Sequence, residues 1–170
     1  MKNTAETPKK QVSQHSIAIR LKLLTIIVAI AGCAFFGVCA ASLIRNKETV
    51  IKYCLSLELV LVLVGITALL CYAALWQFWK VSTQIGRDNS FSIENYISFR
   101  IMSILFLVLA AVWILSLGVY VAGAGRLESA VLFKAGELIF VWLGVAALTG
   151  TLATLIDKAR QIREENDLTI

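Results

Sequence analysis

Proline, histidine and charged residues are scarce in this chain of 170 residues. There is one proline and one histidine, and charged residues make up 16%, against about 25% in an average soluble domain. Hydrophobic residues make up 59%, more than a single soluble domain of this size could shield from water. These figures exclude a soluble globular domain, a disordered chain and a disulfide-rich secreted domain. A membrane protein with several spans remains.

Motifs that carry catalysis or metal binding are also missing. The sequence has no H-E-x-x-H, G-x-S-x-G or phosphate-binding loop, and its four cysteines form no C-x-x-C pair. A membrane metalloenzyme would need clustered histidine, cysteine or acidic side chains. The sequence therefore predicts no catalytic, metal-binding or cofactor-binding residues, and an enzyme is the least favoured class.

Four long stretches contain no charged residue. They are Leu23–Ile44, Leu59–Trp79, Ile101–Gly125 and Leu138–Ile156. A hydrocarbon core of about 30 Å needs roughly 20 helical residues, so each stretch is long enough to cross it. Strands of a membrane barrel would be shorter and would alternate in polarity. We therefore expect an all-α membrane protein, a bundle of four transmembrane helices.

The pattern of charges divides the chain into three parts. We expect an N-terminal cytoplasmic tail at 1–22, a transmembrane domain at 23–156, and a cytoplasmic helix and tail at 157–170. Within the domain we place the spans at about 23–44, 54–79, 101–123 and 138–156. The segments between charge-free stretches have at most 22 residues. Function must therefore reside in the bundle, its short loops or its tails.

Lysine and arginine are unequally distributed between the two sides of the predicted bundle. Five lie in residues 1–22, three in 80–100 and three in 157–170, whereas the other two loops together hold five. Positively charged loops stay in the cytoplasm, so both termini are predicted to be cytoplasmic. The bias accounts for much of the net charge of +5, and direct binding of nucleic acid is not expected.

The second and fourth spans resemble each other. Aligned without gaps, Leu57–Leu70 and Gly136–Thr149 agree at six of 14 positions, including a glutamate followed seven residues later by glycine. Each match falls in the second helix of a predicted hairpin. This favours two similar hairpins related by an axis along the membrane normal. Two unrelated helices that agree by chance are the alternative.

The matched glutamates, Glu58 and Glu137, allow two interpretations. A carboxylate at a helix N-terminus is stabilised by the helix dipole, and Lys134 lies one turn before Glu137 for pairing. Alternatively, both carboxylates face the bundle interior and form an intramembrane polar pair that binds a cation or holds a proton. The second interpretation would suit a transporter, a channel or an immunity-type protein.

Two segments on the predicted cytoplasmic side carry polar patterns. Before the third span, Ser92 can cap a helix whose first turn contains Glu94. After the fourth span the chain should continue as a helix that ends in Glu164–Ile170. The residues of interest are Phe91, Ser92, Glu94, Asn95 and Arg100 in the first segment, and Glu164, Glu165, Asn166, Asp167, Leu168, Thr169 and Ile170 in the second.

These two motifs, F-S-x-E-N with a nearby arginine and a terminal E-E-N-D-L-T-I, are similar to those of the bacterial family called domain of unknown function 2975. The resemblance covers essentially the whole chain. It implies a small multi-pass protein of the bacterial inner membrane without assigned chemistry. Members are often encoded beside a small helix-turn-helix regulator, which suggests such a regulator as a cytoplasmic partner.

The sequence thus leaves two functional hypotheses. The first is a regulatory or interaction module that docks a cytoplasmic protein through the two segments above, with the lipid bilayer as its surroundings. The second is a transporter, channel or immunity-type protein that uses the two glutamates. Small residues spaced by four, at Ala146, Gly150 and Thr154, would let helices approach closely and also allow a homo-oligomer.

Overall fold

The computed structural model describes residues 7–53, 56–87, 90–123 and 128–168, with the backbone alone at 7–15, 52–53 and 167–168. These residues form helices and short connections, and no strand occurs among them. The helices are α1 (Thr7–Arg45), α2 (Lys47–Tyr53), α3 (Leu57–Ile85), α4 (Ile93–Gly123) and α5 (Ser129–Leu168).

Four of these helices, α1, α3, α4 and α5, are long and apolar enough to cross a membrane. The expected all-α class with four membrane-spanning helices is therefore confirmed. Each predicted span lies on one helix, although the predicted start of the second span, at 54–55, falls outside the described residues. The helices are longer than the predicted spans, and α5 (Ser129–Leu168) continues beyond its span at both ends. Where the membrane begins and ends along each helix stays a prediction.

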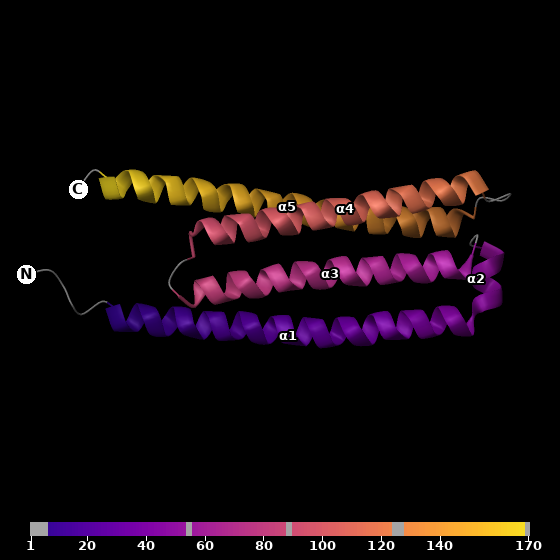
Figure 1. Ribbon diagram of the computed structural model, residues 1–170, viewed down its shortest axis with the longest axis horizontal. Helices are drawn as coiled ribbons and strands as arrows, with labels where there is room; N and C mark the ends of the chain where they lie inside the picture. Colours follow the sequence, from indigo (N-terminus) through magenta and orange to yellow (C-terminus); the bar gives the residue numbers. More distant parts are fainter. Residues whose placement is uncertain (1–6, 54–55, 88–89, 124–127, 169–170) are drawn as a thin grey trace, which may run out of the picture.

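The four long helices run antiparallel in the order of the sequence (Figure 1). The main packed pairs are α1 with α3, α3 with α4, and α4 with α5, and the last pair shares the largest interface. The chain therefore forms two hairpins that meet along α3 and α4. Whether an axis relates the two hairpins stays a prediction.

The two ends of the molecule differ. At one end, the tail end, α1 begins, α5 finishes, and α3 connects to α4 (Figure 1). At the other, the loop end, lie α2, the end of α4 and the beginning of α5. The beginning of α1 and the end of α5 project beyond the α3–α4 connection. The predicted topology would place the tail end in the cytoplasm.

Helix α2 is a feature that the sequence analysis did not anticipate. The side chain of Asn46 donates to the carbonyl of Ser42 at 2.9 Å, and the Asn46 carbonyl then accepts the backbone N–H of Val50 at 3.1 Å. The chain thus turns at Asn46 and resumes a helix. The sequence did not predict α2 because its seven residues include three charged ones and show no apolar periodicity.

The interior is best packed between α3 and α4 in the half nearer the tail end. Ala74, Val81 and Met102 are buried there. Aromatic and aliphatic side chains pack around them, namely Phe78, Ile85, Phe99, Leu105 and Phe106. Most other large apolar side chains of the long helices are exposed, as expected of helices that contact lipid.

Polar bonds and small residues join the remaining pairs of helices. The Tyr72 hydroxyl of α3 donates to the Ala29 carbonyl of α1 at 2.7 Å. The Ser103 hydroxyl of α4 donates to the Ala146 carbonyl of α5 at 2.8 Å, beside Gly150. Ala146 and Gly150 therefore lie at the interface between α4 and α5, whereas Thr154 is exposed. Two residues of the predicted small-residue stripe thus pack within the chain.

Candidate functional sites at the two ends

The connection between α3 and α4 is organised by Ser92. Its hydroxyl accepts the backbone N–H of Asn95 at 3.2 Å, and its carbonyl accepts that of Tyr96, so Ser92 caps α4 as the sequence indicates. The Asn95 amide donates to the Ser90 carbonyl at 2.9 Å. Ser92 and Asn95 are buried, at 6% and 1% exposure. These two residues build the turn, and a partner could not contact them directly.

The other residues of this motif lie at the surface. Phe91 is 50% exposed, and Glu94 is exposed in the first turn of α4. Arg100 donates to the Tyr96 hydroxyl and lies 5.9 Å from that ring, which directs its guanidinium along the helix. The predicted docking motif thus separates into buried residues that shape the connection and exposed residues that a partner can reach.

A groove of about 360 Å³ lies beside this connection, between α3 and α4. Its lining is mixed: Gln77, Trp79, Lys80, Thr83, Gln84, Glu94, Ile97, Ser98 and Ile101. Lys22 of α1 reaches over the Trp79 ring, with its Nζ 5.4 Å from the centroid. Three helices therefore bring charged and aromatic side chains to one side of the tail end.

The last turns of α5 form the second predicted segment. Arg160 donates to Asp157 at 3.0 Å and to Glu164 at 2.7 Å. These hydrogen bonds, first of all the one to Asp157, raise the pKa of the Arg160 guanidinium above its usual value. The three side chains form a ladder along one face, where pairs three and four residues apart are neighbours. The ladder favours a helix in this highly charged stretch.

The acidic residues of this segment present an exposed helical surface. Glu164, Glu165 and Asn166 are exposed, and the helical backbone continues through Asp167 and Leu168. Ile162 is 59% exposed among these charged neighbours. Thr169 and Ile170 lie outside the described residues.

Glu58 and Glu137 lie on exposed surfaces at the loop end. Glu58 is in the first turn of α3, where its backbone N–H donates to the Ser56 hydroxyl at 3.2 Å. The Glu137 carboxylate pairs with Lys134 at 2.8 Å, one turn away on α5. Their helices are not among the main packed pairs. These local roles match the simpler interpretation and give a facing, interior carboxylate pair no support.

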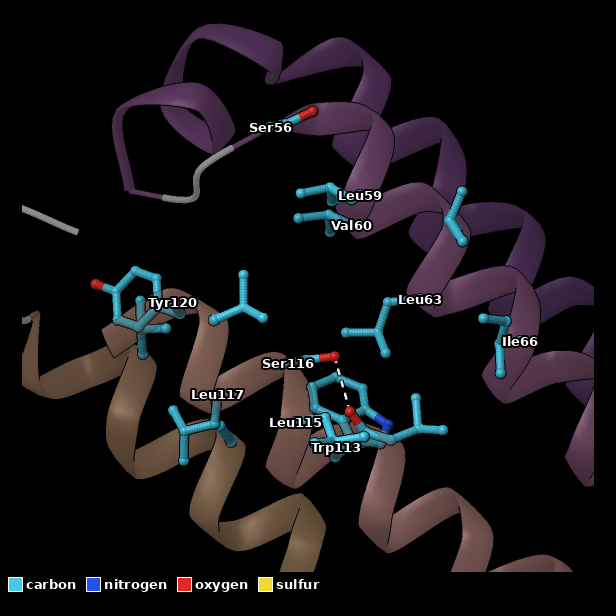
Figure 2. A pocket seen from close by; sticks show the side chains of 15 residues that line it. Ser56, Leu59, Val60, Leu63, Ile66, Trp113, Leu115, Ser116, Leu117 and Tyr120 are labelled. Carbon is cyan, nitrogen blue, oxygen red and sulfur yellow. Dashed lines mark hydrogen bonds between the residues drawn. The ribbon is translucent and has the colours of Figure 1, made fainter. Parts of the chain in front are cut away.

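The loop end also contains a cleft of about 420 Å³ between the outer halves of α3 and α4 (Figure 2). Leu63 and Ile66 line it from α3, and Trp113 and Ser116 line it from α4. The side chain of Ala135 adds a contribution from α5. The lining is almost entirely apolar. The cleft lies toward the loop end, whereas the buried cluster between the same two helices lies toward the tail end.

Hydrogen bonds mark the inner end of this cleft. The Trp113 indole N–H donates to the Thr67 hydroxyl at 3.2 Å, and Thr67 itself donates to the Leu63 carbonyl at 2.8 Å. Thr67 is 5% exposed. The bonded pair closes the space between α3 and α4 at the depth where their tight packing starts.

The sequence analysis missed the cleft. One signal was present: Trp113, Ser116 and Tyr120 are spaced by three and four and so share one face of a helix. In a span this apolar, three residues with polar atoms on one face indicate a surface turned away from bulk lipid. The cleft depends on how α3 and α4 pack against each other, which the sequence pattern does not contain.

Comparisons with known proteins give one match. The model of a family described as a protein of unknown function, DUF2975, matches residues 7–170. No curated protein and no solved structure matches the chain. The match extends through all five helices, including the projecting ends of α1 and α5. The chain therefore belongs to the DUF2975 family.

Proposed function

We propose that the protein is a membrane-anchored interaction module of the bacterial inner membrane, which acts by binding a cytoplasmic protein at its tail end and not by catalysis. The observation that carries this proposal is the projection of α1 and α5 beyond the α3–α4 connection (Figure 1). Short loops alone would offer little surface for a partner. The projecting ends of α1 and α5, together with the α3–α4 connection, can contact one partner at the same time.

The exposed side chains at the tail end fit such a role. Phe91 and Ile162 are large apolar groups with exposures of 50% and 59%, outside the predicted spans. Around them lie charges of both signs, including Glu94, Glu164 and Lys80. An apolar anchor surrounded by a polar rim is the usual composition of a protein interface.

The partner that we propose first is a small helix-turn-helix regulator. A DNA-binding domain carries a basic face, which the acidic residues Glu164 and Glu165 would complement. Binding of the regulator to this membrane protein would then compete with its binding to DNA. A channel or transporter would instead need a polar path through the helices, and the exposed positions of Glu58 and Glu137 offer none.

A crosslinked pull-down from native membranes tests this proposal. Full-length protein is compared with a chain that ends at Arg163, which lacks Glu164 and Glu165, and with the double variant Phe91→Ala, Glu94→Gln. We expect the same cytoplasmic protein to be captured by the full-length chain and to be lost or strongly reduced with both variants. A purified regulator, if captured, should be displaced from the membrane protein by its own operator DNA.

The control is Glu58→Gln, which changes an exposed carboxylate at the opposite end. This variant should capture the partner as the full-length chain does. Equal thermal unfolding of all variants in detergent establishes that the changes leave the helices intact. Identical sets of captured proteins from the full-length chain and both tail-end variants would contradict the proposal.

A further inference from the structure

We propose that the cleft between α3 and α4 at the loop end is a binding site for one acyl chain of a membrane lipid. The inference is independent of the proposed docking function, because the cleft and the tail end lie at opposite ends of the molecule (Figures 1 and 2).

The length of the cleft fits one leaflet of a bilayer. Its lining on α3 runs from Ser56 to Ile66, and ten helical steps of about 1.5 Å give roughly 15 Å. The hydrocarbon core of a bilayer is about 30 Å thick, so one leaflet contributes about half of that. A chain that enters at the loop end would therefore finish where the cleft finishes.

The cleft is closed at its inner end, which excludes an occupant that must continue through the membrane. The bond between Trp113 and Thr67 and the tight packing beyond it block the space between α3 and α4. A transmembrane helix of a partner, or of a second copy of this chain, would have to continue through the bilayer past this point. An acyl chain ends in the middle of the membrane and needs no passage.

The lining favours a hydrocarbon occupant over water. Its polar groups in the spans are bonded within the protein: Ser116 donates to the Val112 carbonyl at 2.8 Å, and the Trp113 indole donates to Thr67. A water molecule needs two to four polar partners to remain in a cavity. An empty apolar space would forfeit dispersion contacts along its whole lining. The volume of about 420 Å³ also falls within the usual range for small-ligand sites.

The sides and the mouth of the cleft fit a lipid as well. Val62 and Leu115 form exposed lips, at 58% and 69% exposure, so a chain can enter sideways from the bilayer. Hydroxyl groups lie at the loop end, from Ser56 and from Tyr120, whose oxygen accepts the backbone N–H of Glu128 at 3.2 Å. Polar groups at this level suit the headgroup region.

The test uses the full chain in phosphatidylcholine vesicles with a small fraction of phosphatidylcholine that carries a photoreactive group in its acyl chain. After illumination, the labelled residues are mapped by mass spectrometry. We expect saturable labelling concentrated on cleft residues such as Val60, Leu63 and Leu117. Uniform labelling of all exposed helix faces, without saturation, would show ordinary surrounding lipid and would overturn the proposal.

A matched pair of variants sharpens the result. Leu63→Phe fills the cleft, whereas Leu69→Phe makes the same change on the exposed surface of the same helix, where Leu69 is 71% exposed. Leu63→Phe should reduce cleft labelling about tenfold by removing the space for the chain, and Leu69→Phe should leave it unchanged. Equal labelling of the two variants would contradict the site.

Two further measurements cover the remaining outcomes. If Leu63→Phe does not fold, Val60→Phe serves as the filling variant, since Val60 also lines the cleft. A photoreactive leucine analogue placed at Leu63, which lines the cleft and is only partly exposed, identifies the neighbour directly. Crosslinks to lipid support the proposal, and crosslinks to a second copy of the chain or to another protein overturn it. A failure of this site would leave the tail-end pull-down unaffected.

Discussion

Single residues set how closely the helices approach one another. At Gly150 an added Cβ would lie 3.0 Å from the Ser103 hydroxyl of α4, whereas at Gly144, on the same helix, nothing lies within 4 Å. The two glycines therefore have different roles, although both are part of one apolar stretch. Gly150 permits the bond between Ser103 and the Ala146 carbonyl, which joins the two helices of the second hairpin.

Replacement of Gly150 by leucine should separate α4 from α5 and destabilise the protein by about 1–3 kcal/mol, the usual effect of overpacking. Gly144→Leu is the control, because both changes gain the same helix propensity of about 1 kcal/mol. Thermal unfolding in detergent measures the difference. Equal unfolding temperatures for the two variants would show that the close approach at Gly150 does not matter.

A second prediction concerns the bond that joins α1 to α3. Tyr72→Phe removes the hydroxyl that donates to the Ala29 carbonyl and lies 2.8 Å from the Cys33 sulfur. We expect Tm to fall by about 2–4 °C, as for the loss of one modest hydrogen bond in a chain of this size. Cys33→Ala keeps the bond to the carbonyl and should lower Tm less. The reverse order would assign the stabilisation to the sulfur contact.

At the scale of the helices, the sequence predicts the four membrane spans, but it predicts the ends of the helices less well. Charge-free stretches predict the spans because the bilayer penalises charge along the whole width of its core. Beyond the spans, ion pairs such as Arg160 with Asp157 continue α5, and these local pairs carry no apolar pattern. The cap at Ser92 could be predicted, because side chain and backbone lie within three residues.

The candidate sites show the same division. The sequence suggested Phe91, Glu94 and the acidic end of α5 as docking residues, and whether they bind a partner stays a prediction. It could not assign Asn95 to the interior, because the bond to the Ser90 carbonyl depends on how the turn folds. Nor could it identify the cleft, which is lined by residues of two helices about 50 positions apart in the sequence and depends on how they pack.

The ladder on α5 leads to a prediction for the helix as a unit. Arg160→Gln removes the pairs with Asp157 and Glu164 and should speed amide hydrogen exchange in residues 157–168 by about two- to fivefold, because exposed ion pairs stabilise only modestly. Arg163→Gln, an exposed change of the same kind on the same turns, is the control. If amide exchange were faster in both variants, the loss of a positive charge, and not of the Arg160 ion pairs, would be the cause.

At the scale of the whole molecule, the beginning of α1 and the end of α5 lie at the same end (Figure 1), and the distribution of lysine and arginine predicts that this end is cytoplasmic. Fusion of a fluorescent protein to the C-terminus should therefore give fluorescence in bacterial cells. Fusion of alkaline phosphatase after Gly123, at the loop end, should give an active enzyme. The opposite pattern would invert the topology and place the projecting helices outside the cell.

The serial order of the helices has a consequence for how the protein is made. The main packed pairs join helices that follow one another along the chain, so the main interfaces do not require the first helix to find the last. The hairpin of α1 and α3 can form while α4 and α5 are still being synthesised, and each later helix meets a partner that is already in place. Contacts between sequence neighbours favour rapid folding, and here they also suit insertion into a membrane one helix after another.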